Sequence, residues 1–262
     1  FSFLFYLFSK IIMFFLSPNP SPYLVYGMKD ATQMMEIPQT LAMKRSVPIV
    51  RSYDEYDGIE FTYSFWIYVN DLEYSDNSHY YKHVFHKGSL KENSDGIYEP
   101  NNAPGVYLYT GTKQKPAEEN IDDHRNTLGL LVRMNVHHNS ESSTNPYTYY
   151  DDIYVDNIPI KKWVGVIVRL TSQNVVDVYI NGTLSKRHRM SNLVKQNYDN
   201  VYVNMNGGFF GNLSNLKYYN YAIGTLEIDS ITSNGPNLKM SKGNSLETSK
   251  PYYLSSNWFY GD

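Results

Sequence analysis

Residues 60–69 read EFTYSFWIYV, and this stretch decides the fold class. Apolar or aromatic side chains occupy every second position, at Phe61, Tyr63, Phe65, Ile67 and Val69. A period of two places these side chains on one face of a β-strand. We therefore predict a strand that turns this face toward a hydrophobic core.

Further strands follow along the chain, separated by turn-forming residues. The two-residue spacing recurs at Leu128, Leu130, Val132, Met134 and Val136, at Val164, Val166, Val168 and Leu170, at Val176, Val178 and Ile180, and at Val201, Val203 and Met205. Asn181-Gly182 predicts a type I′ hairpin, because both central residues of that turn need positive φ. Apart from residues 1–16 and a short turn near 222–228, no helical pattern occurs. The sequence predicts an all-β protein.

Composition narrows the class of protein. The chain has 262 residues, 42% of them hydrophobic and 16% aromatic, which is enough for one large β-sandwich. A net charge of −3 gives no reason to expect nucleic acid as a partner. The absence of cysteine excludes disulfides and thiolate chemistry and favours an intracellular or intravirion setting.

The chain divides into four predicted parts. Residues 1–16 are an apolar run that we interpret as a membrane anchor, with a signal sequence or an element buried against a neighbour as alternatives. The numbering begins on Phe, so we expect residues upstream. Residues 17–50 form a Pro-rich spacer and lead-in, 51–232 the sandwich, and 233–262 a C-terminal arm. Aromatics at the end of the arm, such as Trp258, predict packing on the sandwich or on another protein.

Three blocks resemble the concanavalin A-like, laminin-G-like family. They are Phe61–Tyr68, then Trp163–Val168 with Val176–Gly182, and finally Gly208–Gly211 with Leu213–Ala222. The resemblance implies a two-sheet antiparallel jelly-roll sandwich, here with an N-terminal hydrophobic anchor segment. It also implies binding or scaffolding rather than catalysis.

A narrower resemblance concerns membrane-anchored laminin-G-like proteins of giant DNA viruses. It is carried by His86-Lys87-Gly88, residues 103–108 and 195–198, and the terminal stretch 251–255. This resemblance implies a virion protein, a minor capsid component at the inner membrane, with other virion or membrane proteins as partners.

Catalytic signatures are incomplete. Glucanases of the superfamily carry Glu-x-Asp-x-x-Glu on one strand, so that the carboxylates share a face. Here Glu227-Ile228-Asp229 lacks the final acid and follows the closing strand, where we expect a solvated turn. His83 and His86 are three apart on a predicted strand, so we expect them on opposite faces, as surface histidines. We predict that the protein is not an enzyme.

Calcium is the ion that the family resemblance implies, held by loop oxygens. The candidate ligands are Asp71, Asp76 and Asn77, or Asp122 and Asp123, or Asp151 and Asp152. Ordinary loop polarity explains each pair as well, and no other cofactor is expected.

Lys186, Arg187 and Arg189 form a basic cluster that could meet lipid headgroups, or simply a solvated face. Exposed tyrosines at 80, 81, 107 and 109 could stack on sugar rings, or pack across strands.

Two functions remain open at this point. The leading one is a non-catalytic structural or interaction protein of a virion, anchored in a membrane through residues 1–16. The alternative is a membrane-tethered lectin that binds a glycan.

Overall fold

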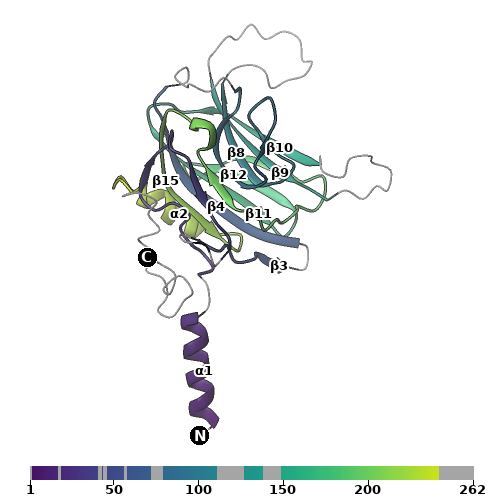
Figure 1. Cartoon of the computed structure of the whole chain (residues 1–262), viewed down its shortest axis with the longest axis vertical. Helices are drawn as coiled ribbons and strands as arrows, with labels where there is room; N and C mark the ends of the chain where they lie inside the picture. The colour runs from purple at the N-terminus through teal and green to yellow at the C-terminus, as the bar shows by residue number, and fades with distance from the viewer. Residues whose placement is uncertain are drawn as a thin grey trace.

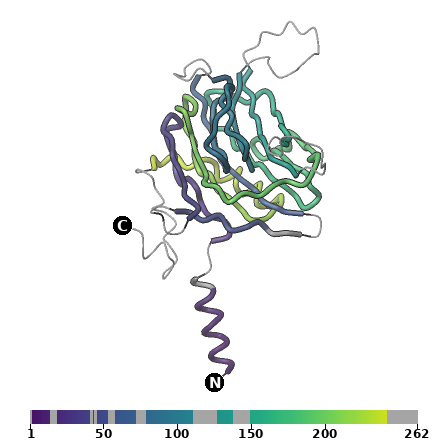
Figure 2. Tube along the Cα trace, turned by 45° about the vertical axis from the view of Figure 1, so that its right-hand side comes forward, coloured from purple at the N-terminus to yellow at the C-terminus, as the bar shows by residue number. Residues whose placement is uncertain are grey.

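The computed structural model describes residues 2–16, 19–40, 43, 46–55, 58–71, 79–110, 127–137 and 149–241. Two antiparallel sheets face each other across one core (Figures 1 and 2). The first sheet has the order β1 (Met28–Asp30), β15 (Gly211–Tyr219), β4 (Gly58–Val69), β11 (Trp163–Thr171), β12 (Val175–Ile180), β13 (Thr183–Arg189), and β3 (Tyr53–Glu55) also pairs with β4. The second has the order β10 (Tyr150–Ile158), β9 (Leu128–Asn135), β8 (Asn102–Thr110), β5 (Lys82–Gly88), β14 (Val201–Val203), β2 (Met35–Ile37). The predicted all-β sandwich is confirmed.

The alternating residues form the core, as their spacing predicts. Phe61, Tyr63, Phe65, Ile67 and Val69 on β4 are each at most 4% exposed. The alternating positions of β9, β11 and β12 join them in the same cluster, with Ile180 partly buried beside it. Met205 departs from the pattern, because the chain leaves β14 for a short 3₁₀ turn, η1 (Met205–Gly207), which packs on the other face of the second sheet.

The Asn181-Gly182 turn joins β12 to β13 as predicted. Its two residues have φ of 50° and 80°, the positive values that a type I′ turn requires. The Asn181 side chain also accepts a hydrogen bond from the Gly165 N–H at 2.8 Å. The turn therefore ties the hairpin to the neighbouring strand.

The lead-in belongs to the sandwich, which corrects the predicted boundary at residue 51. Its strand β1 pairs with β15 in the first sheet, and β2 pairs with β14 in the second. Leu24 and Val25 lie in the core. Strands of three residues are too short to show an alternating pattern, which is why the sequence suggested a loose segment.

Residues near the N-terminus form an exposed helix, α1 (Ser2–Leu16), which projects away from the sandwich in Figure 1. Nine of its large apolar side chains are at least 38% exposed: Phe3, Leu4, Phe5, Tyr6, Leu7, Phe8, Ile11, Ile12 and Met13. Its 15 residues span about 22 Å, against about 30 Å of bilayer hydrocarbon. Within the described residues, no helix is long and apolar enough to cross a membrane, so the predicted spanning anchor is not found there.

The C-terminal part begins with a helix where a solvated turn was predicted. This helix, α2 (Thr225–Asn234), packs Ile228 against Ile167 and Tyr179 on the outer face of the first sheet. Met240 then forms a parallel bridge with Met28. The aromatic residues at 252–260 lie outside the described residues.

Candidate functional site

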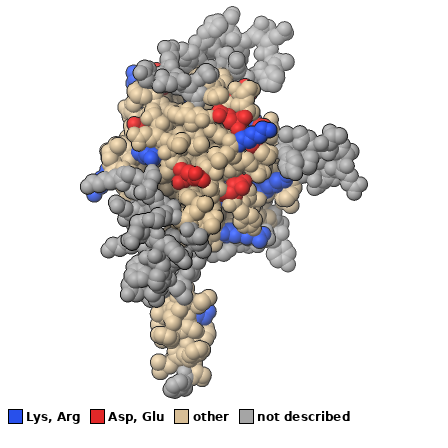
Figure 3. All heavy atoms as spheres, in the orientation of Figure 1, with Lys and Arg blue, Asp and Glu red and all other residues tan. Residues whose placement is uncertain are grey.

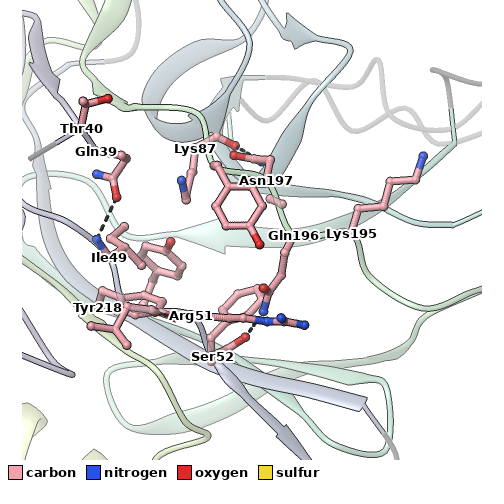
Figure 4. A pocket seen from close by; sticks show the side chains of 15 residues that line it. Gln39, Thr40, Ile49, Arg51, Ser52, Lys87, Lys195, Gln196, Asn197 and Tyr218 are labelled. Atoms are coloured by element: carbon pink, nitrogen blue, oxygen red, sulfur yellow. Dashed lines mark hydrogen bonds between the residues drawn. The ribbon is translucent and has the colours of Figure 1, made fainter. Parts of the chain in front are cut away.

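A pocket of about 280 Å³ opens at one end of the sandwich (Figure 4). Both sheets contribute to it, through β4 and β15 on one side and β5 and β8 on the other. The lead-in closes it with residues 39–40 and 49–52, and the segment before β14 adds residues 195–198. The pocket therefore exists only because segments far apart in the sequence meet at the sandwich edge.

Aromatic rings from the core form the inner wall of the pocket. Phe61 and Tyr63 come from β4, and Tyr218 comes from β15. The Tyr63 ring lies 5.1 Å from that of Tyr218 and 5.7 Å from that of Phe61. Tyr218 also donates a hydrogen bond to the Val50 carbonyl at 3.0 Å, which fastens the lead-in over the wall. Burial raises the pKa of the Tyr63 and Tyr218 phenols, so both are neutral.

Side-chain amides hold the other walls in place. Gln39 accepts a hydrogen bond from the Ile49 N–H at 2.8 Å and donates to the Val47 carbonyl at 3.0 Å. Asn197 donates to the Lys87 carbonyl at 2.9 Å, and Gln196 donates to the Ser52 hydroxyl. These bonds fix the lining before any ligand arrives, which lowers the entropy lost on binding.

Lys87 gives the pocket its charge. It stands near the end of β5, is 7% exposed and points toward the pocket interior in Figure 4. Its ammonium donates to the carbonyl of Asp199. Burial lowers the pKa of Lys87 to about 8, while the Asp199 charge acts in the opposite direction. Among the described residues, the lining contains no Asp or Glu, whereas Arg51 and Lys195 add further basic groups.

Sequence reasoning missed this pocket. In the sequence, Lys87 appears only within the His86-Lys87-Gly88 stretch of the narrower family resemblance. Residues 195–198 likewise appear only within that resemblance. A lysine beside a glycine at a strand end looks like a solvated residue. Only the packing of the lead-in over the sandwich edge reveals that Lys87 is buried.

The histidines of β5 correct a second expectation. His83 and His86 are 1% and 0% exposed and lie on the same face, with 2.6 Å between His83 Nε2 and His86 Nδ1. A bulge between His83 and Phe85 shifts the register, so residues three apart come together and Val84 and Phe85 both enter the core. The predicted surface positions on opposite faces are wrong for this pair.

The hydrogen-bond partners define the tautomers of the two histidines. The Met205 N–H donates to His83 Nδ1 at 3.0 Å, so the His83 proton sits on Nε2 and is donated to His86. His86 then donates from Nε2 to the Ser89 carbonyl at 2.9 Å. Burial lowers the pKa of His83 well below its usual value and that of His86 to about 4. Both rings are therefore neutral links in one chain of hydrogen bonds.

Two of the tyrosines considered for sugar stacking are buried. Tyr107 and Tyr109 are 0% and 3% exposed, beneath a cover that includes Ile97 and Tyr98. Tyr80 and Tyr81 pack beside them. Cross-strand packing is therefore the role of Tyr107 and Tyr109.

Asp151 and Asp152, two of the calcium candidates that the structure describes, are engaged by neighbouring protein groups. Asp152 receives two hydrogen bonds from the Arg133 guanidinium, each 2.7 Å, and Asp151 accepts from the Ser191 N–H and hydroxyl, each 2.6 Å. Asp71 is exposed, and Asp76, Asn77, Asp122 and Asp123 lie outside the described residues. In the described parts of the chain, no group of three His, Asp or Glu side chains is placed to hold a metal ion. A calcium site stays a prediction.

The remaining charged candidates have structural partners or face solvent. Glu227 accepts hydrogen bonds from the Tyr221 hydroxyl at 2.7 Å and the Gly224 N–H at 3.2 Å, capping α2. In the basic cluster, Arg187 pairs with the buried Asp177 at 2.6 Å, whereas Lys186 and Arg189 are exposed on β13.

Comparisons with known proteins add little to the site. No protein-family model matches the chain, and no curated protein matches it. Among solved structures, the receptor-binding domain of botulinum neurotoxin C/D mosaic serotype aligns with a TM-score of 0.43 and 14% identity over 67% of this chain and 36% of that chain. The binding domain of Paraclostridial Mosquitocidal Protein 1 aligns with a TM-score of 0.46 and 14% identity over 83% of this chain and 47% of that chain. The chain thus spans less than half of either structure, and at these TM-scores the likeness carries no functional argument.

Proposed function

We propose that this protein is a non-catalytic binding module whose pocket at the sandwich edge holds one unit of a saccharide. The observation that carries the proposal is the pocket itself, a pre-formed space of about 280 Å³ with aromatic rings on its inner wall and amides around them. Small-molecule sites of proteins run from roughly 300 to 1,000 Å³. This pocket lies just below that range, which suits a single sugar ring.

The chemistry of the lining supports a polar ring-shaped ligand. Tyr198 offers an 80% exposed ring to the C–H face of a sugar, whereas Phe61, Tyr63 and Tyr218 are at most 4% exposed and close the inner end of the pocket. Beyond the bonds that hold the walls, Gln196 and Asn197 each keep a second amide N–H and Ser52 keeps its hydroxyl proton, which can donate to sugar hydroxyl groups.

The placement of the acids supports binding without hydrolysis. Glycosidases need two carboxyl groups that flank one bond. Glu227 and Asp229 lie two residues apart on α2, where side chains do not face each other, and Glu227 is engaged in the helix cap. We expect the protein to leave laminarin uncleaved. Release of reducing sugar by the wild type, abolished by Glu227→Gln, would contradict this.

A glycan array probed with the full chain tests the binding proposal. We expect selective binding that falls at least about tenfold in Tyr198→Ala, because loss of one stacking ring costs about 1.4 kcal/mol or more. Leu226→Ala is the matched control, since it removes an exposed apolar side chain on α2, away from the pocket. An array that shows no binding above background would contradict the proposed saccharide binding.

A second function, attachment of the module to a larger assembly, is favoured by α1. The apolar side chains at positions 3–8 and 11–13 of this helix are exposed, and Lys10 is the single charged residue in its sequence. Figure 3 shows no acidic side chain on the visible face of this helix. A virion scaffold at a membrane, with membrane or virion proteins as partners, is consistent with such a helix and stays a proposal.

A further inference from the structure

Lys87 has an unusual electrostatic position. An ammonium group carries three N–H donors, and within the described part of the chain its hydrogen-bond acceptor is the neutral carbonyl of Asp199. The Asp199 carboxylate accepts instead from the Asn101 amide, at 3.3 Å. A buried charge is costly unless a counter-charge compensates it. Lys87 therefore has donors to spare and points into an open pocket.

Among the described residues of the pocket lining, no ionisable group supplies that counter-charge. Arg51 and Lys195 are basic, and the Tyr63 and Tyr218 phenols are kept neutral by burial. Asp199 is the acid whose charge acts on Lys87, and it lies on the exposed side of the loop. The described lining therefore holds the buried Lys87 ammonium and no carboxylate, and a concave site with charge of one sign concentrates ligands of the other.

From this geometry we infer that the pocket takes an acidic saccharide unit, whose carboxylate or sulfate ester pairs with the Lys87 ammonium. The inference rests on the proposed binding function and names the class of ligand. The anion accepts the N–H bonds that the Asp199 carbonyl leaves open. The sugar ring then lies against the exposed Tyr198 ring of the lining.

A pH dependence follows from the pairing. In the free protein the pKa of Lys87 is lowered to about 8, mainly by burial. A bound anion favours the ammonium and raises this pKa, so binding near pH 8 takes up a fraction of a proton. Above pH 8 the free protein loses the charge that the anion needs. The affinity should then fall by up to about tenfold per pH unit.

Isothermal titration calorimetry with the full chain tests the inference. The probes are an oligosaccharide of hexuronic acid, a sulfated oligosaccharide, the neutral parent oligosaccharide and inorganic sulfate. We expect at least one acidic sugar to bind about tenfold or more tightly than the neutral one at pH 7, and to lose this advantage at pH 9. At pH 8, buffers of different ionisation enthalpy should reveal proton uptake on binding.

Two variants distinguish the effect of the buried Lys87 charge from the effect of removing any one positive charge from the protein. Lys87→Met keeps the length of the side chain and should abolish both the acidic preference and the proton uptake. Lys186→Met removes the same charge from an exposed position on β13, outside the pocket lining, so it should retain both. If Lys87→Met lowers the melting temperature too far for titration, the pH dependence of the wild type decides alone.

The outcomes distinguish the inference from the proposed function. Equal affinity for neutral and acidic sugars would contradict the inferred preference for an acidic ligand, but it would still support the proposed saccharide binding. If inorganic sulfate is the one probe that binds, and Lys87→Met abolishes its binding, the proposed saccharide ligand is wrong and the anion site at Lys87 is supported. Absence of binding by all four probes overturns both.

Discussion

Val178 lies at the centre of the core, 0% exposed, between strands β11 and β13. Val178→Asp should lower the free energy of unfolding by at least about 3 kcal/mol, because it removes a buried apolar group and leaves an unpaired carboxylate. Urea denaturation followed by tyrosine and tryptophan fluorescence measures the change. Ser185→Asp on the exposed strand β13 is the control and should change stability little. An unchanged transition midpoint for Val178→Asp would show that the core register is wrong.

A second prediction for single residues concerns the buried pair His83 and His86, which should make the free energy of unfolding depend on pH. An unfolded histidine binds a proton below about pH 6.5, whereas the folded pKa of His86 is about 4. Between these values the unfolded chain binds more protons, so stability falls as the pH falls. The loss for His86 alone should reach about 3 kcal/mol by pH 4, and His83 adds to it in the same direction.

Urea denaturation between pH 7.5 and 4.5 measures this slope. His86→Phe keeps the ring that stacks on Tyr98 at 4.6 Å but removes the titrating group, so its stability should fall less steeply with acid. Tyr202→Phe is the control, because it alters the other ring that stacks on His86, at 5.1 Å, while leaving both histidines in place, so it should keep the wild-type slope. Parallel slopes in the wild type and His86→Phe would contradict the buried neutral pair.

At the scale of elements, the β12–β13 hairpin depends on one turn residue. Asn181 tolerates φ of 50° and accepts the Gly165 N–H at 2.8 Å. Asn181→Ala should lower the free energy of unfolding by about 1–2 kcal/mol, through backbone strain and a lost acceptor. Asn181→Asp keeps an acceptor and the tolerance of positive φ, so thermal denaturation should place it nearer the wild type. Equal melting temperatures for Asn181→Ala and the wild type would show that the turn does not need asparagine.

At the scale of the whole molecule, the exposed apolar side chains of α1 make attachment to a lipid surface testable. Burying each large apolar side chain in lipid contributes roughly 1.5–3 kcal/mol, so the full chain should float with neutral liposomes in a density gradient. Phe5→Ser with Phe8→Ser should weaken flotation. Leu226→Ser, which alters an 83% exposed leucine on α2, should leave it intact. A wild-type chain that stays at the bottom of the gradient would exclude lipid as the partner of α1.

The sequence by itself determined the sandwich and most of its core. The alternation on β4, β9, β11 and β12 identifies the buried face, because a period of two is a local property of a strand. The Asn181-Gly182 turn was predictable for the same reason, since its backbone conformation depends on those two residues.

Only the tertiary structure decided the site. The pocket forms where the lead-in, β5, β15 and residues 195–198 come together. The residue pattern within any one of these segments does not predict that contact. Lys87 and Asp199, whose ammonium and carbonyl are hydrogen-bonded, are separated by 112 positions in the chain. The bulge that brings His83 to His86 likewise depends on how β5 pairs with β8. Burial and charge pairing are properties of neighbours in space, so they become visible only once the two sheets and the lead-in are packed together.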